Sequence, residues 1–105
     1  MPDYQYDVLL ETLLGERRGA MKLHVRHRRV DGYLKLFGHT EPVSGMVGKD
    51  GIYRLSGKFV TLMSEFYYMA TGRADKEKLD LTIYGGRAVF RMTGTAPTGS
   101  EGIHP

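Results

Sequence analysis

The sequence has no cysteine, no long apolar run and no strong excess of either charge. Without cysteine, neither a disulfide scaffold nor a thiolate metal site can form, and nothing indicates an oxidising compartment. No apolar stretch approaches the roughly 20 residues that span a bilayer. The first residues, Met-Pro-Asp-Tyr-Gln-Tyr-Asp, also lack the basic flank and apolar segment of a signal peptide. We therefore expect a cytoplasmic protein with no membrane partner.

Charge and length indicate one small domain. Fifteen Lys and Arg stand against twelve Asp and Glu, for a formal net charge of +3. An excess this small concerns solubility and does not indicate a partner. A chain of 105 residues rarely divides its core. We expect the domain to occupy residues 1–95, because the sequence from 96 to 105 has no strand pattern and reads as a flexible tail.

The clearest secondary-structure signal lies between Gly51 and Gly72. Apolar residues alternate there with other residues on both sides of a corner at residues 63–65. This is the period of a half-buried β-strand. A helix would have to carry glycines, β-branched residues and three tyrosines, all of which favour other structures. We predict two long strands joined at the corner.

Similar alternation recurs along the chain, and fourteen glycines punctuate it. The first segment would also suit a short helix, because Leu9, Leu10, Leu13 and Leu14 cluster there. Asp31-Gly32 is a strong hairpin signal, but a turn there would put Val30 on a charged face, so we place the turn at residues 27–29. The predicted strands are 4–14, 20–26, 30–37, 43–47, 51–62, 66–72, 79–84 and 88–94, with turns at 15–19 and 38–42 among those that separate them.

These short connections leave no room for crossover helices, so consecutive strands should pair with each other. Closure of the sheet would remove its exposed edges. The fold class is therefore all-β: a single antiparallel up-and-down meander of about eight strands closed into a small barrel. The interior of such a barrel is just wide enough for side chains, or for one small ligand.

The meander, with a glycine opening strand after strand and Tyr67-Tyr68-Met-Ala-Thr-Gly72 in its middle, resembles small uncharacterised bacterial β-barrels of the calycin type. Lipocalins, fatty-acid-binding proteins and avidins share that architecture. The resemblance covers roughly residues 4–95 and implies a barrel that binds a small molecule. It does not imply biotin binding, because the chain has no tryptophan to form the Gly-x-Trp signature of lipocalins or the biotin site of avidins.

The inward face supplies the candidate ligand-binding residues. Three tyrosine hydroxyls could anchor a small apolar or aromatic ligand inside an apolar cavity. The alternative, which the many large inward side chains favour, is a filled core that serves as a rigid body. The candidates are Tyr6, Tyr53, Tyr68, Phe59, Phe90 and Met92. The full inward set adds Val8, Leu10, Met21, Leu23, Val25, Val30, Leu34, Leu36, Val43, Val47, Leu55, Phe66, Leu79, Leu81 and Ile83.

The outward face carries more apolar surface than a monomeric barrel should leave in water. We therefore expect a homo-oligomer, a dimer or higher, that buries the face of the two central strands. The predicted interface comprises Tyr33, Phe37, Val60, Leu62, Tyr67, Met69 and Tyr84, with Met46 nearby.

Other functional patterns are weak. Basic residues between positions 17 and 35 could track a single-stranded nucleic acid. A solvated strand face explains them better, because the net charge is small and acidic residues return further along the chain, so we do not expect a nucleic-acid partner. His24 and His27 point to opposite faces of a strand, and His39 and His104 stand apart, so we predict no metal site. We assign no catalytic residue and no cofactor, and the sequence favours a non-enzymatic role.

Overall fold

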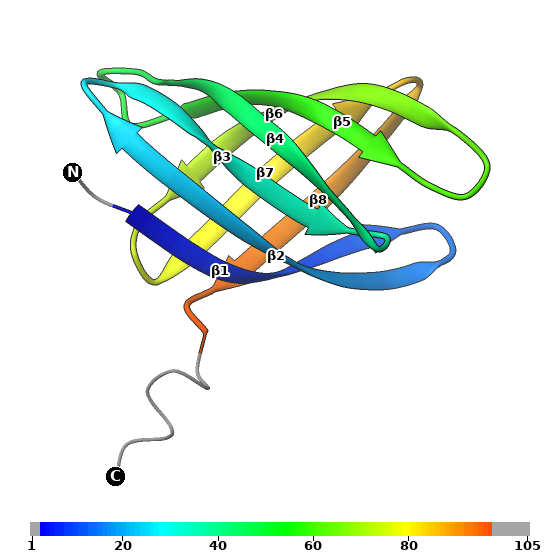
Figure 1. Ribbon diagram of the computed structural model, residues 1–105. Helices are drawn as coiled ribbons and strands as arrows, with labels where there is room; N and C mark the ends of the chain where they lie inside the picture. The colour runs from blue at the N-terminus through cyan, green and yellow to red at the C-terminus, as the bar shows by residue number, and fades with distance from the viewer. Residues whose placement is uncertain (1–2, 98–105) are drawn as a thin grey trace, which may run out of the picture.

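The computed structural model describes residues 3–97, which form a closed barrel of eight antiparallel strands (Figure 1). Each strand pairs with the next, and β1 pairs with β8 to close the sheet. The predicted fold class is confirmed. Across the described residues, no helix of the length and hydropathy needed to cross a bilayer is present. The strands are β1 (Asp3–Thr12), β2 (Gly15–Arg26), β3 (Arg29–Leu36), β4 (His39–Val47), β5 (Tyr53–Val60), β6 (Glu65–Ala74), β7 (Lys78–Gly85) and β8 (Ala88–Thr95).

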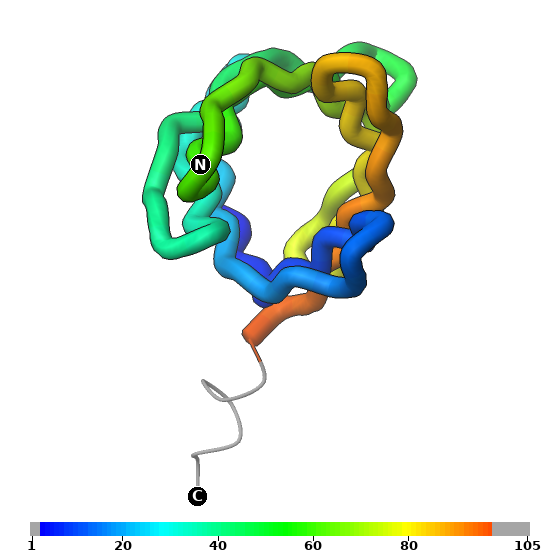
Figure 2. Tube along the Cα trace, turned by 90° about the vertical axis from the view of Figure 1, so that its right-hand side faces the viewer, coloured from blue at the N-terminus to red at the C-terminus, as the bar shows by residue number. Residues whose placement is uncertain are grey.

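Strict alternation of side chains fills the barrel. Among the described residues, eighteen apolar side chains are buried. Figure 2, which looks along the barrel, shows the chain as a ring around this core. Every residue of the predicted inward set is buried, except four that are partly buried and pack against the core: Val25, Val47, Phe66 and Phe90. The prediction of the inward face is confirmed, because burial in a strand follows a period of two.

Inward-facing glycines allow the sheet to bend sharply. A Cβ on Gly32 would lie 1.8 Å from the backbone oxygen of Lys22, and one on Gly45 would lie 2.0 Å from that of Arg54. Any other residue would force these strands apart, so the neighbouring backbone can approach only a glycine. Gly19 and Gly72 are approached by neighbouring backbone in the same way, whereas a Cβ on Gly57 or Gly85 would meet the ring of Tyr68 or Phe66.

The turns differ in part from the prediction. The turn at His27–Arg28 is confirmed, and both residues have positive φ, as type I′ hairpins require. The predicted turns at 15–19 and 38–42 are wrong, since β2 begins at Gly15 and β4 at His39. The polar residues in these two segments are typical of loops. In the structure they belong to the β1–β2 and β3–β4 hairpins, which extend beyond the core, so both faces of these strand ends are exposed to water.

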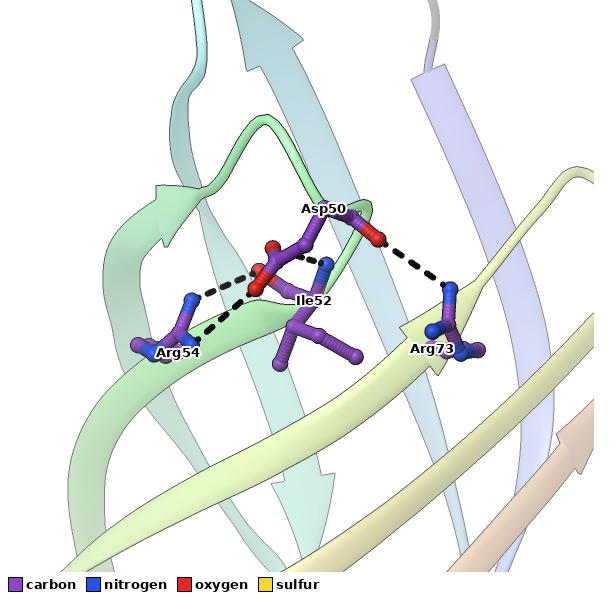
Figure 3. A network of polar contacts seen from close by, with 4 residues as sticks. All are labelled: Asp50, Ile52, Arg54 and Arg73. Atoms are coloured by element: carbon purple, nitrogen blue, oxygen red, sulfur yellow. Dashed lines mark hydrogen bonds and ion pairs between the residues drawn. The ribbon is translucent and has the colours of Figure 1, made fainter.

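The two ends of the barrel are built differently. The loops β2–β3, β4–β5 and β6–β7 lie at one end, here called the far end. In the β4–β5 loop, the Asp50 carboxylate accepts the Ile52 N–H at 2.9 Å and an Arg54 N–H at 3.4 Å, and Arg73 on β6 donates to the Asp50 backbone oxygen at 3.3 Å (Figure 3). These bonds hold the loop against β5 and β6.

Candidate functional site

The opposite end of the barrel, here called the mouth, carries two apolar turns. Leu13 and Leu14 join β1 to β2, and Leu62 and Met63 lie between β5 and β6. Each of these four side chains is at least 85% exposed. Because β5 and β6 lie across the barrel from β1 and β2, the two turns face each other over the opening (Figure 2).

In both turns a threonine hydroxyl forms hydrogen bonds to the backbone. The two turns have the related sequences Thr12-Leu-Leu-Gly15 and Thr61-Leu-Met-Ser64. The Thr12 hydroxyl donates to the Gly15 oxygen at 2.6 Å and accepts the Leu14 N–H at 3.1 Å. The Thr61 hydroxyl makes the corresponding bonds in the other turn, at 3.0 Å to the Ser64 oxygen and 3.3 Å from the Met63 N–H, and it also accepts the Ser64 N–H at 3.1 Å. Each threonine satisfies the polar groups of its turn, so the apolar side chains project outward.

Between the turns lies an open depression of about 790 Å³. Phe37 from the β3–β4 turn and Phe90 from β8 line it together with the apolar turns. Phe37 has a φ of 56° and Gly38 one of 78°, the positive values of a type I′ hairpin turn, as at His27–Arg28. Arg17 is the one charged side chain among the ten residues that line the depression.

An aromatic cluster lies under the mouth, with Phe59 of β5 at its centre. The Phe59 ring meets Phe37 at 6.1 Å and Phe66 at 5.4 Å, both edge to face. It stacks on Tyr68 at a centroid distance of 4.4 Å. Phe59 and Tyr68 are buried. The cluster forms the floor of the mouth and connects it to the core.

Two of the three predicted anchor hydroxyls already have partners. The buried Tyr6 hydroxyl on β1 donates to the backbone oxygen of Asp75 in the β6–β7 loop, at the far end. Burial, followed by the neighbouring hydroxyl of Tyr53, raises the pKa of Tyr6. Burial also raises the pKa of Tyr53, whose hydroxyl is hydrogen-bonded to Tyr4. These hydroxyls fasten the far end of the barrel.

The third hydroxyl, that of Tyr68, differs. Tyr68 is 3% exposed, and its oxygen has no hydrogen-bond partner within residues 3–97. Burial raises its pKa, so the group stays a neutral O–H donor.

Phe90 lines the mouth, whereas Met92 is buried deeper in the core. The structure therefore distributes the six candidate residues over the far end, the core and the mouth.

The predicted interface residues are also divided. Leu62 and Phe37 lie at the mouth, and Phe37 is a correction, because its turn directs it against the core and not outward. Val60 is half-buried, and Tyr33 lies on the outer face of β3. The remaining three, Tyr67, Met69 and Tyr84, line one outer groove of about 630 Å³ over β4 to β7.

The basic residues spread along two strands. Arg17 reaches the mouth, whereas Arg26, His27 and Arg28 lie at the far end. His24 contacts Asp3, its opposite residue on β1. His104 lies outside the described residues, as does the part of the predicted tail from residue 98 on. Within residues 3–97, no group of three His, Asp or Glu side chains could hold a metal ion.

Sequence reasoning missed Leu13, Leu14 and Met63 as site residues. The signal was present in the repeated Thr-Leu-Leu-Gly and Thr-Leu-Met-Ser segments. In each, a pair of adjacent apolar residues interrupts the alternation of a strand directly at its end. Turns are normally polar, so an apolar pair there is the kind of exception that marks a binding surface.

The fold and these surfaces define a class of protein: a small closed antiparallel β-barrel with an apolar core and an apolar mouth. Its architecture is compatible with that of calycin-like barrels. No protein-family model, curated protein or solved structure matches the chain significantly.

Proposed function

We propose that the protein is a non-enzymatic barrel that binds a small apolar or aromatic molecule at its mouth, above the filled core. The proposal is based on the two apolar turns held on opposite sides of one depression. Covering one such leucine or methionine side chain is worth about 1.5–3 kcal/mol. Four of them exposed together indicate a surface that is covered in the working state.

The chemistry of the depression limits the ligand. A volume of about 790 Å³ falls in the range of small-molecule sites. Apart from Arg17, the lining side chains are uncharged, so a ligand with an apolar body and one anionic group fits the site best. In this proposal the protein is a cytoplasmic, calycin-like barrel of the lipocalin and avidin type of architecture. It differs from that type in holding its ligand above the barrel interior.

Titration with 1-anilinonaphthalene-8-sulfonate, an aromatic sulfonate that fluoresces in apolar surroundings, tests the proposal. We expect saturable binding at one site. The double variant Leu14→Ser, Leu62→Ser should weaken binding at least about tenfold, because it removes an apolar contact from each side. Val89→Ser, which removes an exposed apolar side chain from the outer face of β8, is the matched control. Equal binding by all three proteins would refute a site at the mouth.

The second candidate function is self-association through the outer face. Met69 on β6, Tyr84 on β7 and Val89 on β8 lie directly opposite one another in the register, and each is at least 50% exposed. Together with Tyr67 they form a row of apolar side chains across three strands. A second copy of the chain, related by a two-fold axis, would bury this row against itself.

Light scattering during size-exclusion chromatography tests the second candidate. We expect a mass of twice the chain's 11.8 kDa at micromolar concentration, and dissociation on Tyr84→Lys. The control is Leu62→Lys, which adds the same charge at the mouth. A mass near 11.8 kDa, or a dimer that only Leu62→Lys dissociates, would contradict an interface on the outer face.

A further inference from the structure

The wall of the barrel opens along a seam between β4 and β5. These strands pair only from Val43 opposite Gly57 to Val47 opposite Tyr53. Toward the mouth, residues 39–42 of β4 pair with β3 alone, and residues 58–60 of β5 pair with β6 alone. Figure 1 shows the two strands diverging there. The facing edges of these two segments therefore have no strand pairing across the seam.

Charged side chains bridge the seam loosely. The Lys58 ammonium lies 3.9 Å from the Glu41 carboxylate across the seam and 3.8 Å from the Glu65 carboxylate. Both distances are at the long limit for an ion pair, so these pairs contribute little stability. The outer groove of about 630 Å³ begins at this seam and runs over β5 toward β7.

Tyr68 reaches the seam from inside the barrel. Its ring lies across Gly57, so that a Cβ on Gly57 would be 2.5 Å from the Tyr68 hydroxyl oxygen. Both Tyr68 and Gly57 line the groove. Stacking on Phe59 fixes the ring in this position. A buried hydroxyl without a partner is costly, and the few that persist call for a physical reason.

We propose that the seam between β4 and β5 is a second binding site, in which a small, neutral, flat aromatic molecule accepts a hydrogen bond from the Tyr68 hydroxyl. The accepting atom is a ring nitrogen or a carbonyl oxygen on the edge of the ligand. The ring of the ligand lies in the groove against Tyr67, Met69 and Tyr84, which supply aromatic and thioether contacts.

The occupant is neutral because the two charged side chains that line the groove, Lys58 and Glu41, oppose each other at 3.9 Å. It is small because the groove measures about 630 Å³ and Tyr68, which lines it, is almost wholly buried. None of the ten residues that line the mouth depression lines this groove, so the two sites are separate.

Two probes of the same shape test the proposal: isoquinoline, which has a ring nitrogen, and naphthalene, which has none. Binding is followed by NMR at the Gly57 amide and the Met69 methyl group of the whole chain. We expect isoquinoline to bind about tenfold more tightly than naphthalene, the value of one hydrogen bond to an otherwise unpaired group. Tyr68→Phe should abolish this preference, and Tyr33→Phe, on the outer face of β3, should retain it.

Three results would overturn the proposal. One is an isoquinoline preference that survives Tyr68→Phe. Another is a response confined to Leu62 and Phe90, which would place both probes at the mouth. The third is a response of Met69 to dilution of the protein alone together with none to either probe, which would mean that a second copy of the chain covers the groove.

Discussion

The ring of Tyr68 lies across Gly57, the residue paired with it on the neighbouring strand. A Cβ on Gly57 would lie 2.5 Å from the hydroxyl oxygen and 2.8 Å from the ring carbon that bears it. Glycine at this position thus leaves room for the tyrosine ring. The ring in turn covers the backbone of Gly57, which has no side chain of its own. The same arrangement brings a polar atom to the seam between β4 and β5.

Replacement of Gly57 by alanine should destabilise the fold by about 1–3 kcal/mol, because the new methyl group displaces the Tyr68 ring from its stack on Phe59. Urea unfolding measures this free energy. In a Tyr68→Leu background the same substitution should cost clearly less, since the smaller side chain leaves room. If Gly57→Ala lowers the free energy of unfolding by the same amount in both backgrounds, the fold requires Gly57 for a reason other than the Tyr68 ring.

Removal of a tyrosine hydroxyl should have opposite effects at two positions. Tyr68→Phe deletes a buried group without a partner, and we expect an unfolding free energy higher by about 1 kcal/mol. Tyr6→Phe deletes the bond to the Asp75 backbone oxygen and should lower it by about 1 kcal/mol. Thermal unfolding of the two variants without added ligand measures the difference. A lower stability for Tyr68→Phe would reveal a partner, such as an ordered water molecule.

The threonines that hold the apolar turns should be needed for binding at the mouth. Thr61→Val keeps the size of the side chain but removes the bonds to residues 63 and 64. We expect a loss of about 0.5–1 kcal/mol in stability and weaker binding of the anilinonaphthalene probe, because the turn no longer has one fixed shape. Thr40→Val, at an exposed position of β4, is the control. Unchanged binding by Thr61→Val would show that the turn needs no support.

Acid should weaken the β6–β7 loop. The backbone N–H groups of Glu77 and Lys78 donate to the Asp75 carboxylate at 2.8 Å each and hold its pKa below the ordinary 3.8. The unfolded chain therefore takes up this proton at higher pH than the folded chain does. The resulting stabilisation is complete above the unfolded pKa and is lost as pH falls through the folded pKa.

Melting temperatures measured between about pH 5 and pH 2 should accordingly fall less steeply for Asp75→Asn than for the wild type. Asp31→Asn, a change of the same charge in the middle of β3, should follow the wild-type curve. Parallel curves for Asp75→Asn and the wild type would mean that the loop carboxylate contributes nothing to acid stability.

The alternation of residues such as Leu79, Leu81 and Ile83 was enough to predict the strands, their two faces and the closed meander. That information is local, because a strand repeats every two residues and a buried face must be apolar. The turn at His27–Arg28 followed from the same pattern, since a turn at Asp31-Gly32 would have put Val30 on the charged face of the strand before it.

Only the tertiary structure decided how the tyrosines are used. Tyr6 and Tyr68 look alike in the sequence, each an inward residue of a long strand, yet one hydroxyl meets a loop 69 residues away and the other meets nothing among the described residues. The partner of a hydroxyl depends on how far each strand is shifted against the next around the whole barrel. That shift also opens the seam between β4 and β5 and places the two apolar turns on opposite sides of the mouth. It is a property of the closed sheet as a whole, so no single segment of the sequence determines it.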